Sequence, residues 1–385
     1  SGGLTQEISH SEKGGFAFKA AALTHDIITK ASNKIADQIS YPKEGYYLTL
    51  FNPLSWDHTT NVRVPTQPQS SCSRPMHAKQ KNQVALAAAM GDATSQAPAT
   101  EFEGDGPEMT SGYAIGRNLV NLPIELIDGQ FELIDVSTGE NVDYQIAHLT
   151  DPQAAQPWAA EKIAIGHRNP RYLKEIIFIA NDVPAMGYKT YKVVPSKKKT
   201  NLISQEKTSV NQVENQFYKI NIDSSKGAIR SIFDKELGRE LVDKDAAHQI
   251  GQLISRNCQT GQVETSHIKN ISISENGPLY TTIKIKGEMS CCPRWTQEIT
   301  IYNDIKRIDI STRVLRDSTP LRELFFAFPF KIEKPKFLFE ATATVIEPIR
   351  DQLPGSNTDY YAIQHWADVY NDQGGVVWAS IDAPV

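Results

Sequence analysis

The stretch 215–243, NQFYKINIDSSKGAIRSIFDKELGRELVD, decides the fold of this chain. Polar and apolar residues alternate over 217–222, and this period of two predicts a half-buried strand. A turn is expected at 223–227, because glycine tolerates positive φ and Asp or Ser can bond its own backbone. A second short strand is expected at 228–233, before another turn at 234–238. One hairpin alone is marginal in water, so this one is expected to pack on a larger sheet.

Length and composition bound what the protein can be. The chain has 385 residues, which favours two or three domains over a single core. Hydrophobic residues make up 40% and charged residues 22%, as is usual for globular proteins. The net charge of −5 gives no electrostatic reason to expect nucleic acid or a membrane as partner. No apolar run approaches the length of a membrane span, and the first ten residues lack the features of a signal peptide, so the compartment stays unassigned.

The four cysteines give no sign of a metal site. Cys72 and Cys258 are isolated, and Cys291 and Cys292 are adjacent, with no CxxC pair and no histidine at ligand spacing. Successive residues of a strand point to opposite faces, so one thiol of the adjacent pair is expected to be buried and the other exposed. No metal ligand is assigned in this chain.

One amphipathic helix is expected near the N-terminus, over 16–39. Apolar residues recur there at spacings of three and four, which places them on one face, and Pro42 ends the pattern. That face is formed by Ala20, Leu23, Ile27, Ala31, Ile35 and Ile39. It is expected to pack on the sheets downstream or on a helical partner outside this sequence.

The pattern changes to short strands from residue 46. They are separated by Gly, Pro, Asn or Asp and are expected at 46–51, 60–64, 131–136, 142–148, 173–180 and 188–194. Such spacing is typical of a small antiparallel sandwich. The stretch 67–112, rich in Ser, Gln, Ala, Gly and Pro, is expected to be an inserted flexible loop, with a short helix at 84–90.

Further strands are expected beyond the opening hairpin, at 279–287, 295–302, 307–315 and 323–329. Isoleucines alternate with charged residues over 296–315, which predicts a long hairpin around Asn303-Asp304 with one buried and one solvated face. The fold class is therefore mainly β, with a small antiparallel β-sandwich, a larger β-domain after it and a short N-terminal helical segment.

Functional side chains gather only at 359–372. Aromatic faces can cover the C–H side of a sugar ring while carboxylates and amides bond its hydroxyls. The candidate carbohydrate-binding residues are Tyr360, Gln364, Trp366, Asp368 and Asn371. If the segment is extended, Tyr360, Gln364 and Trp366 share one face. The alternative, in which Trp366 is core and the polar residues form a loop network, stays open.

Several stretches together resemble the C-terminal half of glycoside hydrolase family 38, the α-mannosidases. They occur in the family's order and cover roughly two thirds of the chain. They are LFNPLSWDHTTNVRVP at 50–65, IFIANDVPAMGYKTYKV at 177–193, ENQFYKINIDSSKGAIRSIFDKELGRELVD at 214–243, ELFFAFPF at 323–330 and QHWADVYNDQGGVVWASIDAP at 364–384.

The resemblance implies a domain plan. Residues 1–45 look like the end of the family's helical middle domain, and 46–195 look like its small β-domain, with the insertion at 67–112. A linker at 196–209 follows. Residues 210–385 look like the first part of a galactose-mutarotase-like supersandwich.

The resemblance also implies a reaction performed outside this chain. Enzymes of the family carry zinc and an aspartate nucleophile on an N-terminal barrel-like domain, and they retain configuration through a glycosyl-enzyme intermediate. None of the motifs that carry those groups lies in this sequence, so no catalytic residue is assigned and the chain alone is expected to be inactive. The implied partners are a mannose-containing oligosaccharide and the N-terminal catalytic domain, with zinc as the cofactor of the full-length enzyme. An autonomous carbohydrate-binding module, or a structural sandwich of another sugar-active enzyme, stays open as the alternative.

Overall fold

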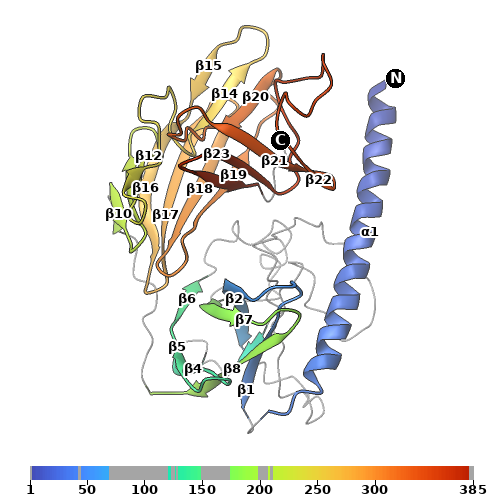
Figure 1. Ribbon diagram of the computed structural model, residues 1–385, viewed down its shortest axis with the longest axis vertical. Helices are drawn as coiled ribbons and strands as arrows, with labels where there is room; N and C mark the ends of the chain where they lie inside the picture. The colour runs from blue at the N-terminus through green and yellow to red at the C-terminus, as the bar shows by residue number, and fades with distance from the viewer. Residues whose placement is uncertain are drawn as a thin grey trace. The chain divides into compact units, whose positions relative to one another are not determined.

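The chain folds mainly into β-sheets, in two compact units that span Ser1–Ile203 and Ser204–Val385 (Figure 1). The structure is a computed structural model, and the residues described are 2–41, 45–68, 120–122, 126, 129–148, 174–197, 207–208 and 211–380. The mainly-β prediction is confirmed.

The N-terminal helix α1 spans Gly2–Ala36, so it is longer at its start than the predicted 16–39 and ends earlier. Gly14 and Gly15 lie inside it. Glycine is a poor helix former, so helix propensity alone does not predict that the helix continues on the N-terminal side of this pair. Among the described helices there is none with the length and apolar character that a membrane crossing needs.

The predicted apolar face of α1 is largely uncovered by the described residues. Leu23 is 55% exposed, Ile27 64% and Ile35 46%, whereas Ser32 and Ala36 near the C-terminal end are buried. Helices of globular proteins bury such a stripe. The packing surface expected for this face is therefore not supplied within the part of unit 1 that the structure describes.

Unit 1 contains two sheets that pack through aromatic pairs. One sheet has the order β1 (Tyr46–Phe51), β8 (Tyr188–Pro195), β4 (Phe131–Asp135), β5 (Asn141–Val142), and the other has β3 (Val120–Leu122), β2 (His58–Pro68), β7 (Lys174–Val183), β6 (Tyr144–His148). Tyr144 stacks on Phe131 with ring centroids 4.1 Å apart, and its hydroxyl donates to the Phe131 carbonyl at 2.6 Å. Phe178 meets Tyr191 edge-on at 4.8 Å.

The strands predicted for this unit are present, with two corrections. The expected strand 142–148 is divided at Asp143, and its two parts, β5 and β6, belong to different sheets. The sandwich is also not purely antiparallel, because β3 pairs with β2 in parallel. The insertion predicted at 67–112 starts two residues too early, because β2 continues to Pro68; its remainder, 69–112 with the short helix, lies outside the described residues.

Unit 2 is built on a sheet of long strands in the order β19 (Ile308–Leu315), β18 (Cys292–Tyr302), β17 (Tyr280–Met289), β16 (His267–Asn276), β9 (Lys207–Thr208). Three smaller sheets accompany it (Figure 1). Their orders are β10 (Gln212–Glu214), β11 (Tyr218–Asp223), β12 (Ala228–Asp234), β13 (Arg239–Glu240); β15 (Val263–Thr265), β14 (Leu253–Asn257), β20 (Arg322–Phe326); and β22 (Thr344–Ile346), β21 (Lys336–Ala341), β23 (Trp366–Asn371), β24 (Gly374–Ala379).

The predicted hairpin at 215–243 forms β11 and β12 and packs on the long strands, as expected. Ile220 and Ile229 lie in one core cluster with Ile285 of β17 and Trp295 of β18. The turn glycine, Gly227, has φ of 59°, and a Cβ there would lie 2.4 Å from Ile268 Cδ1 of β16. The turn therefore requires glycine for its backbone conformation and for its close approach to the sheet.

The adjacent cysteines correct a prediction, since Cys291 and Cys292 are both buried. Cys291 lies in the turn between β17 and β18, where strand alternation does not apply. The two sulfurs are 3.8 Å apart, and Cys291 Sγ lies 3.5 Å from Ser255 Oγ. Burial raises the pKa of the Cys292 thiol to about 12, so this thiol stays protonated at neutral pH.

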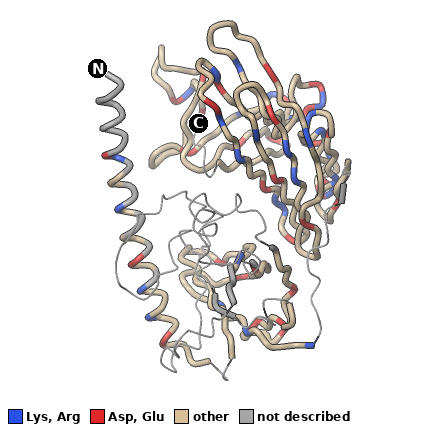
Figure 2. Tube along the Cα trace, turned by 180° about the vertical axis from the view of Figure 1, so that it is seen from behind, with Lys and Arg blue, Asp and Glu red and all other residues tan. Residues whose placement is uncertain are grey.

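Acidic and basic residues are interspersed along the strands of unit 2 (Figure 2). Some face each other across neighbouring strands: Lys284 pairs with Glu298 at 2.8 Å, and Arg256 with Glu323 at 2.6 Å. Cross-strand pairs of this kind contribute little individually, but they favour the observed register.

Candidate functional site

The predicted carbohydrate residues lie in and before β23. The chain from 351 to 365 is irregular, and the strand begins only at Trp366. The condition under which Tyr360, Gln364 and Trp366 would share one face, a continuous extended segment, is not met, because residues 364 and 365 form a bend before the strand. Tyr360 and Gln364 lie in the loop that leads into the strand, and Tyr360 is 67% exposed.

Trp366 and Asp368 share one face of β23, because they are two residues apart in a strand. Both are half-buried. The strand positions beside Asp368 are Leu338 of β21 and Val377 of β24, and Val377 is 67% exposed. This face of the sheet is therefore open to a ligand next to an aromatic ring and a carboxylate.

The side-chain amide of Asn371 forms hydrogen bonds at the turn between β23 and β24. Its Nδ2 donates to the Glu333 carbonyl at 3.0 Å, and its Oδ1 accepts from the Gln373 amide at 2.9 Å. It also alternates to the opposite face from Trp366. The structure brings Trp366 and Asp368 together and separates Asn371 from them.

Sequence reasoning missed Glu340, which organises the loop before β23. Its carbonyl accepts from the Gln364 amide at 2.8 Å, and its Oε2 lies 2.9 Å from His365 Nδ1. The pair places an imidazole and a carboxylate beside Trp366. Glu340 is distant in sequence, so only the pairing of β21 with β23 reveals the contact.

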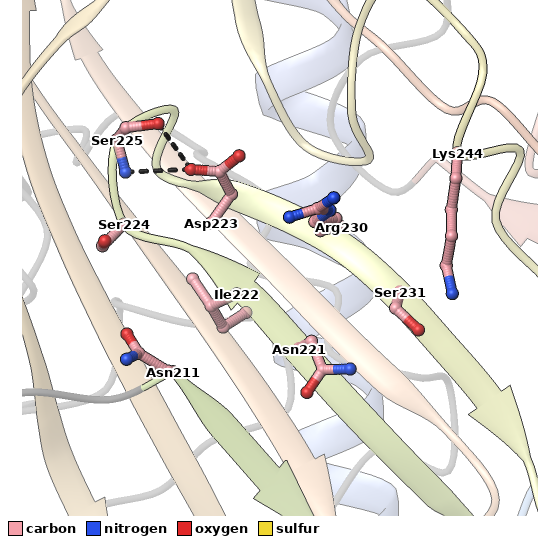
Figure 3. A pocket seen from close by; sticks show the side chains of 9 residues that line it. All are labelled: Asn211, Asn221, Ile222, Asp223, Ser224, Ser225, Arg230, Ser231 and Lys244. Carbon is pink, nitrogen blue, oxygen red and sulfur yellow. Dashed lines mark hydrogen bonds between the residues drawn. The ribbon is translucent and has the colours of Figure 1, made fainter.

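A second candidate site is a pocket of about 620 Å³ on the β11–β12 hairpin (Figure 3). Asn221 pairs with Ser231 and Ile222 pairs with Ile229, which leaves Arg230 as an extra residue in β12. Such a β-bulge turns two consecutive side chains, here those of Arg230 and Ser231, to the same face of the sheet. Both therefore lie on the face that also carries Asn221, their neighbour on the partner strand.

Sequence reasoning assigned no chemistry to this hairpin. A signal was present in AIRSIF at 228–233, where two consecutive polar residues interrupt the alternation between isoleucines. That break is what a bulge produces.

The carboxylate of Asp223 in this pocket is satisfied internally. Its Oδ1 accepts from the Ser225 amide at 3.0 Å and the Ser225 hydroxyl at 2.6 Å (Figure 3), and its Oδ2 accepts from Gln249 Nε2 at 3.0 Å. Burial by itself raises the pKa of Asp223, but these hydrogen bonds outweigh it and hold the pKa below the ordinary value. Asp223 is therefore ionised at neutral pH.

Glu240 forms a similar network at the edge of the pocket. It accepts from the Ser231 hydroxyl at 2.5 Å and the Ile232 amide at 2.7 Å, and it pairs with Lys244 at 2.8 Å. Burial opposes ionisation, yet the Lys244 and Ser231 hydrogen bonds outweigh it and lower the pKa of Glu240. The negative charge is balanced within the hairpin.

Neither location offers a zinc site. Across the described ranges no three His, Cys, Asp or Glu side chains gather in a way that could hold a metal ion. A zinc ion bound by protein takes three or four such ligands. The residues described here do not fit the metal that the family resemblance implies, and no step is assigned through it.

Comparison with known proteins gives a family match within the second unit. Residues 213–379 match the Glycosyl hydrolases family 38 C-terminal domain. No curated protein matches the chain. Among solved structures, an α-mannosidase from Enterococcus faecalis V583 and a glycosyl hydrolase family 38 protein from Enterococcus faecalis are similar to it, each at 12% identity and a TM-score of 0.50.

These likenesses cover 93% of this chain but only 42% and 44% of the two solved chains, so the chain spans less than half of either. At that identity they show the fold. The sequence match lies within unit 2, the unit built on the long strands. Unit 2 is similar to the family 38 C-terminal domain, and the resemblance predicted from the sequence is confirmed.

Proposed function

We propose that this chain is the non-catalytic C-terminal region of a retaining, zinc-dependent α-mannosidase that hydrolyses terminal α-mannosides. The observation that carries the proposal is the match of residues 213–379 to the family 38 C-terminal domain. One of the similar solved structures is described as an α-mannosidase, and this chain corresponds to less than half of it. In this proposal zinc, the nucleophile and the acid–base carboxylate belong to an N-terminal domain of the same protein.

The uncovered face of α1 supports such a partner. Leu23, Ile27 and Ile35 are each about half exposed or more, at 55%, 64% and 46%. A continuous apolar stripe gains stability when another helix covers it. We propose that this stripe is buried by helices located between the catalytic domain and this chain. In this proposal α1 completes a helical middle domain.

Trp366 and Asp368 are the residues proposed to reach the rim of the sugar site. They share an open face of β23, with Tyr360 and Gln364 in the loop leading to it. In this proposal Asn371 acts on the site through the turn that it holds, because both ends of its amide are engaged there.

The first test is hydrolysis of an aryl α-mannoside. The 385-residue chain is expected to give no turnover above the uncatalysed rate, because it carries neither the nucleophile nor the metal of the proposed reaction. The full-length protein is expected to be active, to lose activity when a chelator removes zinc and to recover it when zinc is restored. Turnover by the chain alone would refute the proposal, as would full-length activity that is indifferent to zinc.

A second candidate function, an autonomous carbohydrate-binding module, is favoured by the open Trp366–Asp368 face. In that case the chain alone binds oligomannose, and Trp366→Ala weakens binding about tenfold, because the ring face that covers the sugar is lost. Calorimetric titration measures the change. Trp56→Ala is the matched control, since Trp56 is 58% exposed in unit 1. Equal binding by the two variants, or no binding by the parent chain, excludes this second function.

A further inference from the structure

The pocket on the β11–β12 hairpin presents a cation, Arg230, that forms no ion pair within the described part of the chain. Arg230 is the extra residue of the bulge, it is exposed, and Figure 3 shows it in the middle of the lining. Among the described residues no carboxylate pairs with it. Lys244, the other cation of the lining, is already paired with Glu240 at 2.8 Å.

Three further polar side chains line the pocket without a hydrogen bond to any other described residue: those of Asn211, Asn221 and Ser224. Each can donate one, through an amide or a hydroxyl. They come from separate places: Asn211 directly precedes β10, Asn221 lies within β11 and Ser224 lies in the turn after β11 (Figure 3). The pocket therefore combines a guanidinium fork with three neutral donors.

The two carboxylates near the pocket already accept hydrogen bonds from other residues of the protein. The Asp223 carboxylate takes its hydrogen bonds from Ser225 and Gln249, and the Glu240 carboxylate takes its own from Ser231, Ile232 and Lys244. The donors to Asp223 are neutral, so this carboxylate keeps its negative charge in the lining, but its oxygens are already engaged. What remains open to a ligand is a surplus of hydrogen-bond donors, and it includes the guanidinium of Arg230, which forms no ion pair with a described residue. A ligand rich in acceptors and negatively charged is complementary to that surplus.

The lining does not favour a neutral sugar. None of its nine residues is aromatic, and its one apolar side chain, Ile222, is only 5% exposed. A sugar ring would find no flat apolar surface to cover. Guanidinium and oxoanion, in contrast, match in geometry and charge, because the planar fork can donate two parallel hydrogen bonds.

We propose that this pocket binds the phosphoryl group of a phosphomonoester, with Arg230 donating to its oxygens and Asn211, Asn221 and Ser224 completing the shell. The site is separate from the Trp366–Asp368 face, and the proposal does not depend on the mannosidase assignment. The composition of the pocket depends on the bulge. Without the extra residue, Arg230 and Ser231 would alternate to opposite faces, and the pocket would lose either its cation or its link to Glu240.

The test is calorimetric titration of the 385-residue chain with inorganic phosphate, glucose 6-phosphate and glucose at constant ionic strength. Both phosphate ligands are expected to bind, and glucose is not. Arg230→Gln is expected to raise the dissociation constant for each phosphate ligand about tenfold or more, because a charge-assisted hydrogen bond is lost. Added sodium chloride is expected to weaken binding to the parent chain.

Arg256→Gln is the matched control. It removes the same charge from an exposed arginine of unit 2 that pairs with Glu323, away from the hairpin, and it is expected to leave phosphate binding unchanged. Thermal unfolding of each variant shows whether the fold is kept, and Asn221→Ala, expected to weaken binding about threefold, provides a second variant in the pocket. Tighter binding of glucose 6-phosphate than of inorganic phosphate assigns the site to a sugar phosphate, and equal binding assigns it to the phosphoryl group alone. Absence of phosphate binding, an equal loss in the Arg256 control or equally good binding of glucose would overturn the proposal.

Discussion

Replacing Trp295 with alanine is expected to lower the free energy of unfolding of unit 2 by about 3–5 kcal/mol. Trp295 is 1% exposed and lies in the core cluster between the long sheet and the opening hairpin, with Ile299 and Ile229. Its removal leaves a cavity that the surrounding β-branched side chains can fill only in part. The indole Nε1 has no hydrogen-bond partner among the described residues, so the loss is one of packing.

Trp295→Phe is expected to cost less, about 1–2 kcal/mol. Part of the ring volume is kept, and the unpartnered buried N–H disappears together with the indole. Val377→Ala provides the surface control in the same unit, because Val377 is 67% exposed, and it is expected to stay within about 0.5 kcal/mol. A Trp295→Ala cost no larger than that of this control would contradict the core assignment.

A substitution at Gly287 tests the packing of Trp295 from the other side, because Gly287 is paired with Trp295 in the register of β17 and β18. A Cβ at Gly287 would lie 2.6 Å from Trp295 Cε2 and 2.7 Å from the His267 carbonyl oxygen. Gly287→Ala is therefore expected to destabilise the parent chain and to cost less in the Trp295→Ala background. Relief is expected to be partial, since the contact with the His267 carbonyl remains.

The measurement is denaturant unfolding followed by far-UV circular dichroism, with hydrogen exchange of peptides from 280–302 to assign the transition to unit 2. The assignment is needed because a chain of two units is not expected to unfold in one step. Strict additivity of the Gly287 and Trp295 effects would show that the ring and the backbone do not meet there.

Much of this fold was predictable because alternation with period two is a local signal. The strands of the opening hairpin and the first strand, Tyr46–Phe51, follow directly from it. The signal fails where a bulge intervenes. β16 was missed because its isoleucines are displaced by register shifts near Ile268 and Ile273, so that its apolar residues do not keep one parity.

The candidate sites were less predictable, because both depend on contacts between distant segments. The sequence indicated Trp366 and Asp368, but it could not show that the strand begins at Trp366 and that Asn371 closes a turn. Glu340 enters only through the pairing of β21 and β23. The break in AIRSIF at 228–233 indicates a bulge in β12, but only the pairing with β11 shows that Arg230 is the residue left without a partner position.

The second large effect is expected at Asp234, which fixes the turn after β12. Asp234 is 2% exposed, its Oδ1 accepts from the Glu236 and Leu237 amides at 3.0 Å each, and its Oδ2 pairs with Lys306 at 2.9 Å. Asp234→Ala is expected to lower the free energy of unfolding by about 2–4 kcal/mol, because it leaves two amides and an ammonium group without their acceptor. Asp234→Asn is expected to cost about 1–2 kcal/mol, since it keeps an oxygen for the amides and loses the charge.

The stability contributed by Asp234 is expected to depend on pH. Burial by itself raises the pKa of Asp234, but the Leu237 amide and Lys306 outweigh it and hold the pKa below the ordinary Asp value. A depressed folded-state pKa contributes stability that is complete above the unfolded value of about 3.9 and is lost as the pH falls through the folded value. The stability gap between the parent chain and Asp234→Asn is therefore expected to be constant from pH 7 to about pH 5 and to narrow below pH 4.

Denaturant unfolding of both chains from pH 7 down to the lowest pH at which they fold measures this gap directly. Other carboxylates with lowered pKa values, such as Asp223 and Glu240, make the parent chain acid-sensitive as well, but they are common to both chains and cancel in the difference. Glu236→Gln is the control, because it removes the other carboxylate on Lys306, is 55% exposed and is expected to change stability by less than about 1 kcal/mol. A gap that stays constant below pH 4 would mean that the fold does not lower the pKa of Asp234, and it would contradict a carboxylate stabilised by the amides and Lys306.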